Sequence, residues 1–430
     1  MPRSTLVVNS SFPELDHLAA GLAEAGLLSR YVRPYSNLGR TWERAIARLP
    51  LMGDVYRRTI GRRTLPAGLT ARMIRESAVI QDVVLALAQR APLLGNWGRE
   101  QRSALINART RALALAGERA LRNETAVIAT WGCAEPVFRK MKQKGGVCLL
   151  NYSLAHHYFT RRLLQEEAAR EPNFADTLKD EDRPKWLEEQ FDNEISLADR
   201  ILVGSSFVRD SFLAEGVPRD KIEIVPYGAD IGLFHPAATD KLKTDHTFNL
   251  LFVGQVGQRK GISYLLRAYE RFRGPGTRLS LIGWMQGSGA AFRRYSSMFE
   301  YIGHVPHSLL PDFFRKADIF VFPTLVEGMP LVVLEAMASG VPVIVTPNGP
   351  GDIVRDGIDG FVVPIRDVDS IVDRLERLRR DPDLRMEMGR NARQRALEFT
   401  WQIYRREVVT RISKWLANRA VEQTSVKAIG

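Results

Sequence analysis

The stretch that decides the fold runs from Ala317 to Val345 and reads ADIFVFPTLVEGMPLVVLEAMASGVPVIV. One apolar run, Ile319 to Phe322, stops at Pro323, and a second, Val341 to Val345, begins after Gly340. The pattern therefore predicts a strand, a tight loop, a helix and another strand. Pro330 suits the first helical position, where its fixed φ is favourable and its missing N–H costs no hydrogen bond. The expected helix covers Leu331 to Ser339, and Gly340 closes it.

The start of this helix has the properties of an anion-binding site. Backbone N–H groups near Gly328, Met329 and Leu331 are expected to lack helical partners, and the helix dipole adds partial positive charge there. Glu327 precedes the helix and Glu335 lies on its second turn, so one ligand across the helix start could contact both carboxylates. Two acids eight residues apart are also compatible with ordinary capping and a solvated surface.

Length and composition indicate a large protein with anionic partners. The chain has 430 residues, more than one hydrophobic core usually organises, so we expect two domains. Apolar residues make up 45% of the sequence, and the net charge of +12 favours nucleotide phosphates, anionic lipid or nucleic acid as partners. With only Cys133 and Cys148, a disulfide framework is not expected. No apolar run has the form of a signal peptide or a membrane span, so we expect a cytoplasmic protein.

The first domain, expected over residues 1–235, has the alternation of a parallel sheet. A strand over Thr5–Asn9, a helix over Leu15–Ala25 and a strand over Leu27–Val32 form its first unit. Ligands of such sheets bind at the carboxyl ends of the strands. The first turn lacks glycines, so we interpret it as a surface turn rather than a phosphate-binding loop. Further strands are expected over Ala126–Thr130, Val147–Asn151, Arg200–Val203 and Ile222–Val225.

A helical, arginine-rich insertion over about 37–125 interrupts this alternation. It holds 16 arginines and no lysine against seven acids, a net charge of +9 and most of the excess charge of the molecule. Apolar residues such as Trp42, Leu49 and Met52 lie between the arginines, which favours an amphipathic basic face. Three interpretations remain open: docking on an anionic membrane, a solvated helical face, or binding of an anionic acceptor or nucleic acid. No motif that reads RNA or DNA accompanies the arginines.

Two adjacent histidines follow the strand that ends at Asn151, where an open sheet presents binding or catalytic groups. His156 and His157 could bind a metal, but no third ligand lies nearby in the sequence, so we expect no metal site. Ordinary surface histidines are the alternative. The region that follows, Leu163–Asp192, is helical and acidic. Three glutamates in and just after it are available for salt bridges with the arginine-rich segment: Glu166, Glu167 and Glu194.

The second domain is expected over residues 248–400, after a polar linker over 236–247. A final helix over 401–418 is long enough to reach back across the first domain.

The second domain opens with a strand over Phe248–Val253 and the loop GQVGQRKGI. Gly254 lets the backbone approach a ligand, and Arg259 and Lys260 supply cations suited to phosphate oxygens. A glycine-containing loop with two cations is also compatible with an ordinary charged turn. Further strands are expected over Leu279–Gly283, Tyr301–Val305 and Phe361–Val363.

Together these segments resemble the donor-binding half of the retaining glycosyltransferases of family 4. The stretch 317–345, FVGQVGQRKGI at 252–262, YIGHV at 301–305 and GDIVRDGIDGFVVP at 351–364 carry the resemblance, and Glu327 with Glu335 matches the E-x7-E signature of the family. The resemblance covers residues 200–401 well and the first 200 residues only in topology and a few loops. It implies an α/β protein with the GT-B fold, in which two Rossmann-like domains with parallel sheets face each other and a C-terminal helix crosses back to the first domain.

The resemblance also implies roles for residues of the second domain. Lys260 would hold the diphosphate of a nucleotide-sugar with Arg259 close by, and Gln255 stands where many members have an arginine. Glu335 would bind the ribose hydroxyls, and Glu327 the hydroxyls of the donor sugar. Backbone N–H groups from Gly328 through Met329 to Leu331 would stabilise the leaving diphosphate without a metal.

Other positions match the family less directly. His156 best matches the active-site histidine that contacts the donor sugar, with His157 as the fallback. Val305, after His304, matches the strand end that contacts the base. Two further residues resemble positions beside the base and pyrophosphate: Asp318 and Pro323.

We therefore predict a retaining, metal-independent glycosyltransferase without a cofactor, acting in polysaccharide biosynthesis. It would move a sugar from a nucleotide-diphosphate sugar to a glycan, a lipid-linked glycan or a small molecule. A nucleotide-sugar epimerase or phosphorylase of the same fold is one alternative, and a non-catalytic basic scaffold or nucleic-acid binder is another, although nucleic acid is not the expected partner. The expected location is the cytoplasm, with peripheral docking on the inner face of the membrane through the arginine-rich segment.

Overall fold

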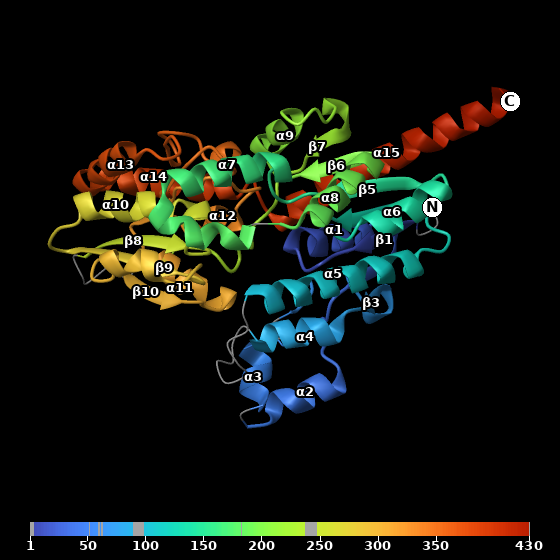
Figure 1. The fold of residues 1–430 in the computed structure, drawn as a ribbon, viewed down its shortest axis with the longest axis horizontal. Helices are drawn as coiled ribbons and strands as arrows, with labels where there is room; N and C mark the ends of the chain where they lie inside the picture. The colour runs from blue at the N-terminus through green and yellow to red at the C-terminus, as the bar shows by residue number, and fades with distance from the viewer. Residues whose placement is uncertain are drawn as a thin grey trace.

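The computed structural model of the chain describes residues 4–50, 52–58, 61, 63–88, 99–181, 183–236 and 247–429. Two parallel β-sheets organise the molecule, one from each half of the chain (Figure 1). The predicted linker over 236–247 falls almost wholly outside the described residues. Among the described residues, no helix combines the length and apolar character that crossing a membrane requires.

The first sheet has seven parallel strands in the order β3-β2-β1-β4-β5-β6-β7. Its central strands are buried on both faces: Val7 packs in one cluster with Leu15 of the first helix, and Leu6 packs in another with Ala114. The strands are β1 (Thr5–Val8), β2 (Leu28–Arg33), β3 (Ile74–Glu76), β4 (Ala126–Thr130), β5 (Val147–Asn151), β6 (Arg200–Val203) and β7 (Ile222–Ile224).

The helices of this half connect the strands or stand away from the sheet. They are α1 (Pro13–Glu24), α2 (Thr41–Arg48), α3 (Met52–Arg58), α4 (Val79–Ala88), α5 (Arg99–Ala120), α6 (Glu135–Gln143), α7 (His157–Arg170), α8 (Lys185–Leu197) and α9 (Ser206–Leu213), with the 3-10 segments η2 (Ala71–Met73), η4 (Pro172–Glu181) and η5 (Arg219–Lys221).

The second sheet has six parallel strands in the order β10-β9-β8-β11-β12-β13. These are β8 (Phe248–Val253), β9 (Thr277–Ile282), β10 (Glu300–Gly303), β11 (Ile319–Phe322), β12 (Val343–Val345) and β13 (Gly360–Val362). The helices of this half are α10 (Ile262–Phe272), α11 (Leu310–Lys316), α12 (Leu331–Ala338), α13 (Val368–Arg380), α14 (Pro382–Ala396) and α15 (Trp401–Ile429), with η6 (Gln258–Lys260), η7 (Ala290–Tyr295), η8 (His307–Leu309) and η9 (Pro350–Asp352).

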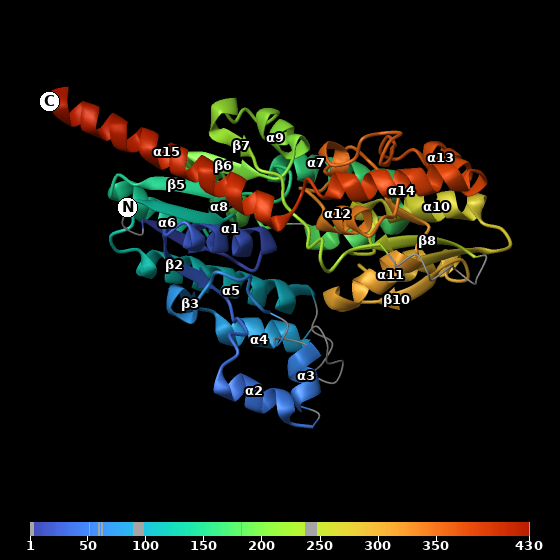
Figure 2. The same ribbon diagram turned by 180° about the vertical axis from the view of Figure 1, so that it is seen from behind.

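The last helix joins the two halves. From the end of α14, α15 turns back and runs along the first sheet beside α1 (Figure 2). The ring of Trp401 at its start stacks on His17 of α1 with 3.9 Å between centroids. Gly21 of α1 favours this close packing, because an added Cβ would lie 3.1 Å from the side chain of Val409, which would have to shift. The predicted fold class, two Rossmann-like parallel sheets with a returning C-terminal helix, is confirmed.

The arginine-rich segment is not purely helical. Strand β3 lies within it and extends the edge of the first sheet beside β2, and α5 packs against the sheet through Ala114 and Ala116. The alternation rule missed β3 because its three residues, Ile74–Glu76, are too few to show a period. By contrast, α2 and α3 project from the body of the molecule as a helical hairpin, which is seen at the lower edge of Figure 1.

The predicted salt bridges between the acidic region and the arginine-rich segment are wrong for all three glutamates. Glu194 is fully buried and accepts hydrogen bonds from the backbone N–H groups of Gly132 and Ala134, at 2.6 and 2.8 Å. Glu166 and Glu167 instead pair with Arg366, which belongs to the second half of the chain. Sequence patterns could not show this, because 199 residues separate Arg366 from Glu167.

Candidate active site

The candidate site lies at the carboxyl ends of β8 and β11, where the sequence motifs meet. The carboxylate of Glu327, in the loop after β11, pairs with both Arg259 and Lys260 of η6. All three side chains are largely shielded, with 9% of the Lys260 side chain and 15% of each of the other two exposed. Glu327 comes 68 residues after Arg259 and 67 after Lys260 in the sequence, yet the three side chains form one cluster.

The backbone explains why these loops meet. Gly261 has φ +69, and an added Cβ would lie only 2.0 Å from the carbonyl oxygen of Pro323, so only glycine allows the η6–α10 turn to pass the end of β11. The backbone N–H of Leu325 donates to the carbonyl oxygen of Arg259 at 3.0 Å. The two loops are thus held by main-chain contacts that do not depend on the charged side chains.

Helix α12 begins at Leu331, as the sequence predicts, and ends one residue earlier than predicted, while Pro330 precedes the helix instead of taking its first position. Pro330 is the N-cap, with φ −74 and ψ 110, and the helical residues are Leu331–Ala338. Among the described residues, no hydrogen bond is formed by the backbone N–H groups of Gly328, Met329 or Leu331. The start of α12 therefore presents main-chain donors and the positive end of the helix dipole beside the Arg259–Lys260 cluster.

Glu335 has a partner that the sequence did not indicate. Its Oε1 lies 2.6 Å from Nε2 of His307, at the start of η8, and this hydrogen bond raises the pKa of His307 above its usual value. The pair lines a cavity of about 720 Å³ between the two halves, together with His17 of α1 and Trp401 of α15. No motif links His307 to Glu335, because only the fold brings η8 next to the second turn of α12.

The His307–Glu335 pair predicts a pH-dependent part of the stability. Since the folded state raises the pKa of His307 above 6.5, the pair stabilises the fold fully below that pH, and the contribution is lost as pH rises through the raised pKa. The thermal midpoint of His307→Gln should therefore fall further below that of the wild type at about pH 6 than at about pH 9. Thermal unfolding across this range checks the prediction, and a difference that stays constant with pH would contradict it.

The first half of the chain covers this site with the loop after β5. The carbonyl oxygen of Ser153 lies so close to Gly328 that an added Cβ would approach it to 1.9 Å. Ala155 packs against Val326, and the hydroxyl of Ser205 donates to the carbonyl oxygen of Gly328 at 2.7 Å. Residues directly before His156 thus contact residues directly beside Glu327, so the two halves close over the start of α12.

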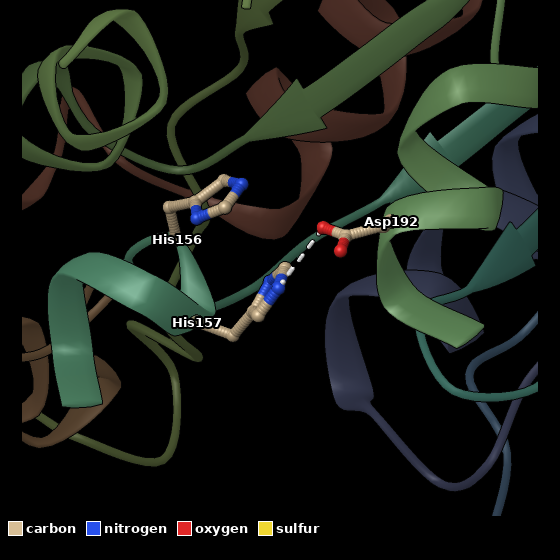
Figure 3. A group of neighbouring side chains, drawn as sticks. All are labelled: His156, His157 and Asp192. Carbon is tan, nitrogen blue, oxygen red and sulfur yellow. Dashed lines mark ion pairs between the residues drawn. The ribbon is translucent and has the colours of Figure 1, made fainter. Parts of the chain in front are cut away.

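His156 and His157 are both buried and both neutral at physiological pH. Burial lowers the pKa of His156 to about 4 and that of His157 to about 3. Nδ1 of His156 accepts a hydrogen bond from the N–H of Tyr158 at 3.3 Å and so caps α7. Nε2 of His157 lies 3.2 Å from Asp192 of α8, as the dashed line in Figure 3 shows. The interpretation of two ordinary surface histidines is wrong, because 3% or less of either residue is exposed.

The structure also supplies the third ligand that the sequence lacked. One atom each from His156, His157 and Asp192 lie within 4.8 Å of one another, close enough for a metal ion (Figure 3). Asp192 is held by the hydroxyl of Tyr158 at 2.6 Å as well as by His157. The argument against a metal from sequence proximity is therefore wrong, while the absence of a metal in the reaction remains a prediction.

The other predicted site residues lie around this centre. Gly254 follows the end of β8 with φ +153, and its carbonyl oxygen would be 1.8 Å from a Cβ on Gly283, so both turns require glycine. Sδ of Met329 accepts a hydrogen bond from the N–H of Tyr227 at 2.9 Å. Leu331 lines the cavity that holds Glu335, and Val305 packs at the edge of the core after β10.

The sequence interpretation of Asp318 as a residue beside the base and pyrophosphate is wrong. Asp318 precedes β11, and its Oδ2 accepts from the N–H of Asn249 at the start of β8, at 2.8 Å. Pro323 follows Asp318 by five residues along the strand, so the two lie roughly 16 Å apart. In a parallel sheet the amino ends of the strands face away from the ligand edge, so Asp318 supports the sheet instead of a base or pyrophosphate.

Two parallel Rossmann-like sheets that close over a site between them, with a last helix returning to the first, define the GT-B fold. Sucrose-phosphate synthase from Thermosynechococcus elongatus has this arrangement, with a TM-score of 0.66 and 18% identity over 96% of this chain and 99% of that one. The Anabaena protein HepE in complex with UDP and glucose gives a TM-score of 0.62 and 14% identity over 96% and 99% of the two chains. At these identities the likeness concerns the fold alone.

The sequence comparisons go further for the second half. Residues 238–395, within the second half of the chain, match the family described as Glycosyl transferases group 1. The D-inositol 3-phosphate glycosyltransferase of Pseudarthrobacter chlorophenolicus is 34% identical over 203 residues, which are 43% of this chain and 48% of that protein. The protein of the same name from Corynebacterium jeikeium is 33% identical over 204 residues, 42% and 49% of the two. The chain thus spans about half the length of the curated relatives it matches.

Proposed function

We propose that the protein is a retaining, metal-independent glycosyltransferase that moves a sugar from a nucleoside-diphosphate sugar to a hydroxyl acceptor. The observation that carries the proposal is the cluster of Arg259 and Lys260 with Glu327 beside the amino end of α12, under the loop that bears His156. Cations and main-chain donors suit a diphosphate, and a carboxylate suits sugar hydroxyls.

These groups divide the chemistry between them. The bond between the anomeric carbon and the diphosphate breaks, and charge builds on the leaving phosphate beside Lys260, Arg259 and the amide groups that begin α12. The acceptor oxygen bonds to the same face of that carbon, and its proton passes to a phosphate oxygen of the leaving group. Neutral His156 offers a hydrogen bond to the sugar without adding charge.

The cavity next to this cluster suits the nucleoside. It adjoins Glu335, whose carboxylate can accept from ribose hydroxyls, and its about 720 Å³ lies within the size range of small-molecule sites. HepE has been solved with UDP-glucose, so UDP-glucose is the first donor to test. The matched relatives carry the name D-inositol 3-phosphate glycosyltransferase, so that polyol phosphate is the first acceptor to test beside glycans and lipid-linked glycans.

Product analysis with and without acceptor tests the proposal. A panel of nucleotide-sugars is first ranked by the rise in thermal midpoint that each causes, because a ligand that binds only the native state raises it. We then expect transfer that requires an acceptor and continues in the presence of EDTA. Conversion of the donor without any acceptor would favour an epimerase, and nucleic-acid binding without nucleotide-sugar binding would favour a basic scaffold.

We further propose that the α2–α3 hairpin docks the enzyme on an anionic membrane. The hairpin exposes three apolar side chains, Trp42 near the start of α2 and Leu49 and Met52 at the turn between the helices, with 45%, 46% and 61% of each accessible. Arg44 and Arg48 of α2 are exposed as well. Tryptophan with arginine is the combination that interfacial helices present to lipid headgroups.

Vesicle sedimentation tests the docking surface. The full chain should sediment with vesicles that contain phosphatidylglycerol, more weakly with phosphatidylcholine alone, and less as salt rises from about 0.1 M to about 0.5 M. The double variant Trp42→Ser/Leu49→Ser should lose this binding. Trp186→Ser on α8, where the residue is 52% exposed, is the matched control and should bind like the wild type. Equal sedimentation of both variants would remove the hairpin from the proposal.

A further inference from the structure

One segment of the first half makes polar contacts with both halves, with the first half near its start and with the second half from Glu166 onward. We call residues 157–181, α7 and η4, the bridge segment. It follows His156 directly in the chain, and η4 packs against η6, which carries Arg259 and Lys260. The bridge segment therefore touches both sides of the candidate site.

Glu167 is the centre of these contacts and is fully buried. Its Oε1 accepts from Nε2 of Gln258 and from the hydroxyl of Tyr264, both at 2.7 Å. Its Oε2 accepts from Nε of Arg366 at 2.7 Å. All three donors come from the second half, so a buried carboxylate of the first half is satisfied entirely by the other domain. A buried charge without such partners is strongly disfavoured, so this contact is specific.

Gln258 connects Glu167 to the loop that carries Arg259 and Lys260. It is the first residue of η6, and its side chain is fixed at both ends: Nε2 donates to Glu167, and Oε1 accepts from the N–H of Ser263 at 3.1 Å. The backbone N–H of Gln258 donates to the hydroxyl of Thr177 in η4 at 2.9 Å. The next two residues of the chain are Arg259 and Lys260. The backbone that carries both cations is thus held by the bridge segment.

The other end of the bridge segment is held by the first half. The N–H of His156 donates to the hydroxyl of Ser211 at 2.9 Å, and the hydroxyl of Tyr158 donates to Asp192 at 2.6 Å. Helix α7 covers the roughly 16 Å from His156 to Glu167 without a break. Apolar packing supports the far end, where Phe174 contacts Phe292 and Tyr295 of the second half.

We propose that Glu167 is a positioning residue for the donor: through Gln258 it fixes the Arg259–Lys260 loop, and through α7 it ties that loop to His156. The diphosphate as ligand of the loop rests on the proposed function, whereas the link between Glu167 and the loop does not. Both cations are then already in position when the diphosphate binds. The distance between the loop and His156 is likewise fixed before the donor binds.

Two neighbouring glutamates provide the test. Glu167→Gln removes the buried charge that Gln258, Tyr264 and Arg366 share, while Glu166→Gln removes a carboxylate that is 57% exposed and contacts only Arg366 and Arg170 among the described residues. Amide hydrogen exchange over residues 256–262 is measured in the full chain without ligand. Exchange should be faster in Glu167→Gln and unchanged in Glu166→Gln. This readout does not depend on which donor the enzyme uses.

Kinetics with the donor from the panel give the second readout. Glu167→Gln should raise the donor KM about ten-fold with a smaller change in kcat, the effect of one lost hydrogen bond that positions the cations. Gln258→Ala should have a similar effect, and the double variant should lose no more than either single one. Unchanged exchange and unchanged KM in Glu167→Gln, with only a lower thermal midpoint, would overturn the proposal. If the wild type binds no nucleoside diphosphate, the proposed function is wrong. The comparison of amide hydrogen exchange between Glu167→Gln and Glu166→Gln still tests whether Glu167 positions the Arg259–Lys260 loop.

Discussion

Lys260→Ala should abolish most of the transfer activity while leaving the fold intact. We expect kcat/KM for the donor to fall about 10²- to 10³-fold, the range seen when one preorganised donor to a developing negative charge is removed. Only 9% of the Lys260 side chain is exposed, so water cannot take its place at full strength. The binding of the nucleoside diphosphate itself should weaken as well, because a charge is lost in the ground state too.

Two variants separate this role from a general effect. Lys260→Arg keeps the charge but replaces a compact ammonium by a planar fork, so it should recover only part of the activity. Lys316→Ala, at the exposed end of α11 in the same domain, should behave like the wild type. The thermal midpoint of Lys260→Ala without ligand should stay close to that of the wild type, because Arg259 still pairs with Glu327. Activity within about two-fold of the wild type would exclude Lys260 from the diphosphate site.

Much of the centre could be predicted from the sequence because its parts lie at the ends of recognisable strands. The bounds of β4, β5, β6, β8 and β11 agree with the predicted ones, and parallel strands bring their carboxyl ends to one edge. The family resemblance assigned Glu327 and Lys260 to one ligand, and the structure puts the two side chains in contact. The place of these loops at one edge depends on topology and not on details of packing, whereas their shared ligand came from the resemblance.

The parts that could not be predicted depend on contacts between elements that share no strand edge. His307 reaches Glu335 from η8, Asp192 reaches His157 from α8, and Arg366 reaches Glu167 across the two halves. None of these pairs has a periodic pattern or a short spacing, so the sequence carries no signal for them. Asp318 shows the opposite error: its motif was recognised, but its place before β11 puts it at the wrong end of the strand.

The two halves of the chain are in direct contact at the start of α12. Ser153 and Ala155 lie against Gly328 and Val326, so the first half covers the amino end of α12. In the proposed reaction a donor sugar would lie next to these loops, whose closure would exclude water from the reacting carbon. Helix α7 starts at this contact and ends at the Glu167 network. Binding and closure therefore act on the same short set of loops.

Glu327→Gln should separate binding of the nucleoside diphosphate from turnover. In the structure this carboxylate neutralises one of the two positive charges of Arg259 and Lys260. Its removal raises the local charge by one unit, so an incoming diphosphate is attracted more strongly and no longer competes with a carboxylate for the same cations. The affinity for the nucleoside diphosphate should therefore rise, by about three- to ten-fold if a fraction of the Coulomb energy at an effective dielectric of ~20 is recovered.

Turnover should change in the opposite direction. A carboxylate that accepts hydrogen bonds from sugar hydroxyls forms charge-assisted bonds, and an amide replaces them only in part, so kcat should fall about 10- to 100-fold. Without ligand the thermal midpoint should drop, since two shielded cations lose their partner, while the rise caused by the nucleoside diphosphate should be larger than in the wild type. Glu270→Gln, whose carboxylate pairs with Arg294 on the surface, is the control and should leave both quantities unchanged. Weaker binding of the diphosphate to Glu327→Gln would contradict the proposal that Glu327 and the diphosphate compete for the same cations. Lys260→Ala is expected to bind the diphosphate more weakly and Glu327→Gln more tightly. Simple destabilisation of the loop would weaken binding in both variants, so the two together distinguish it from a charge-balanced donor site.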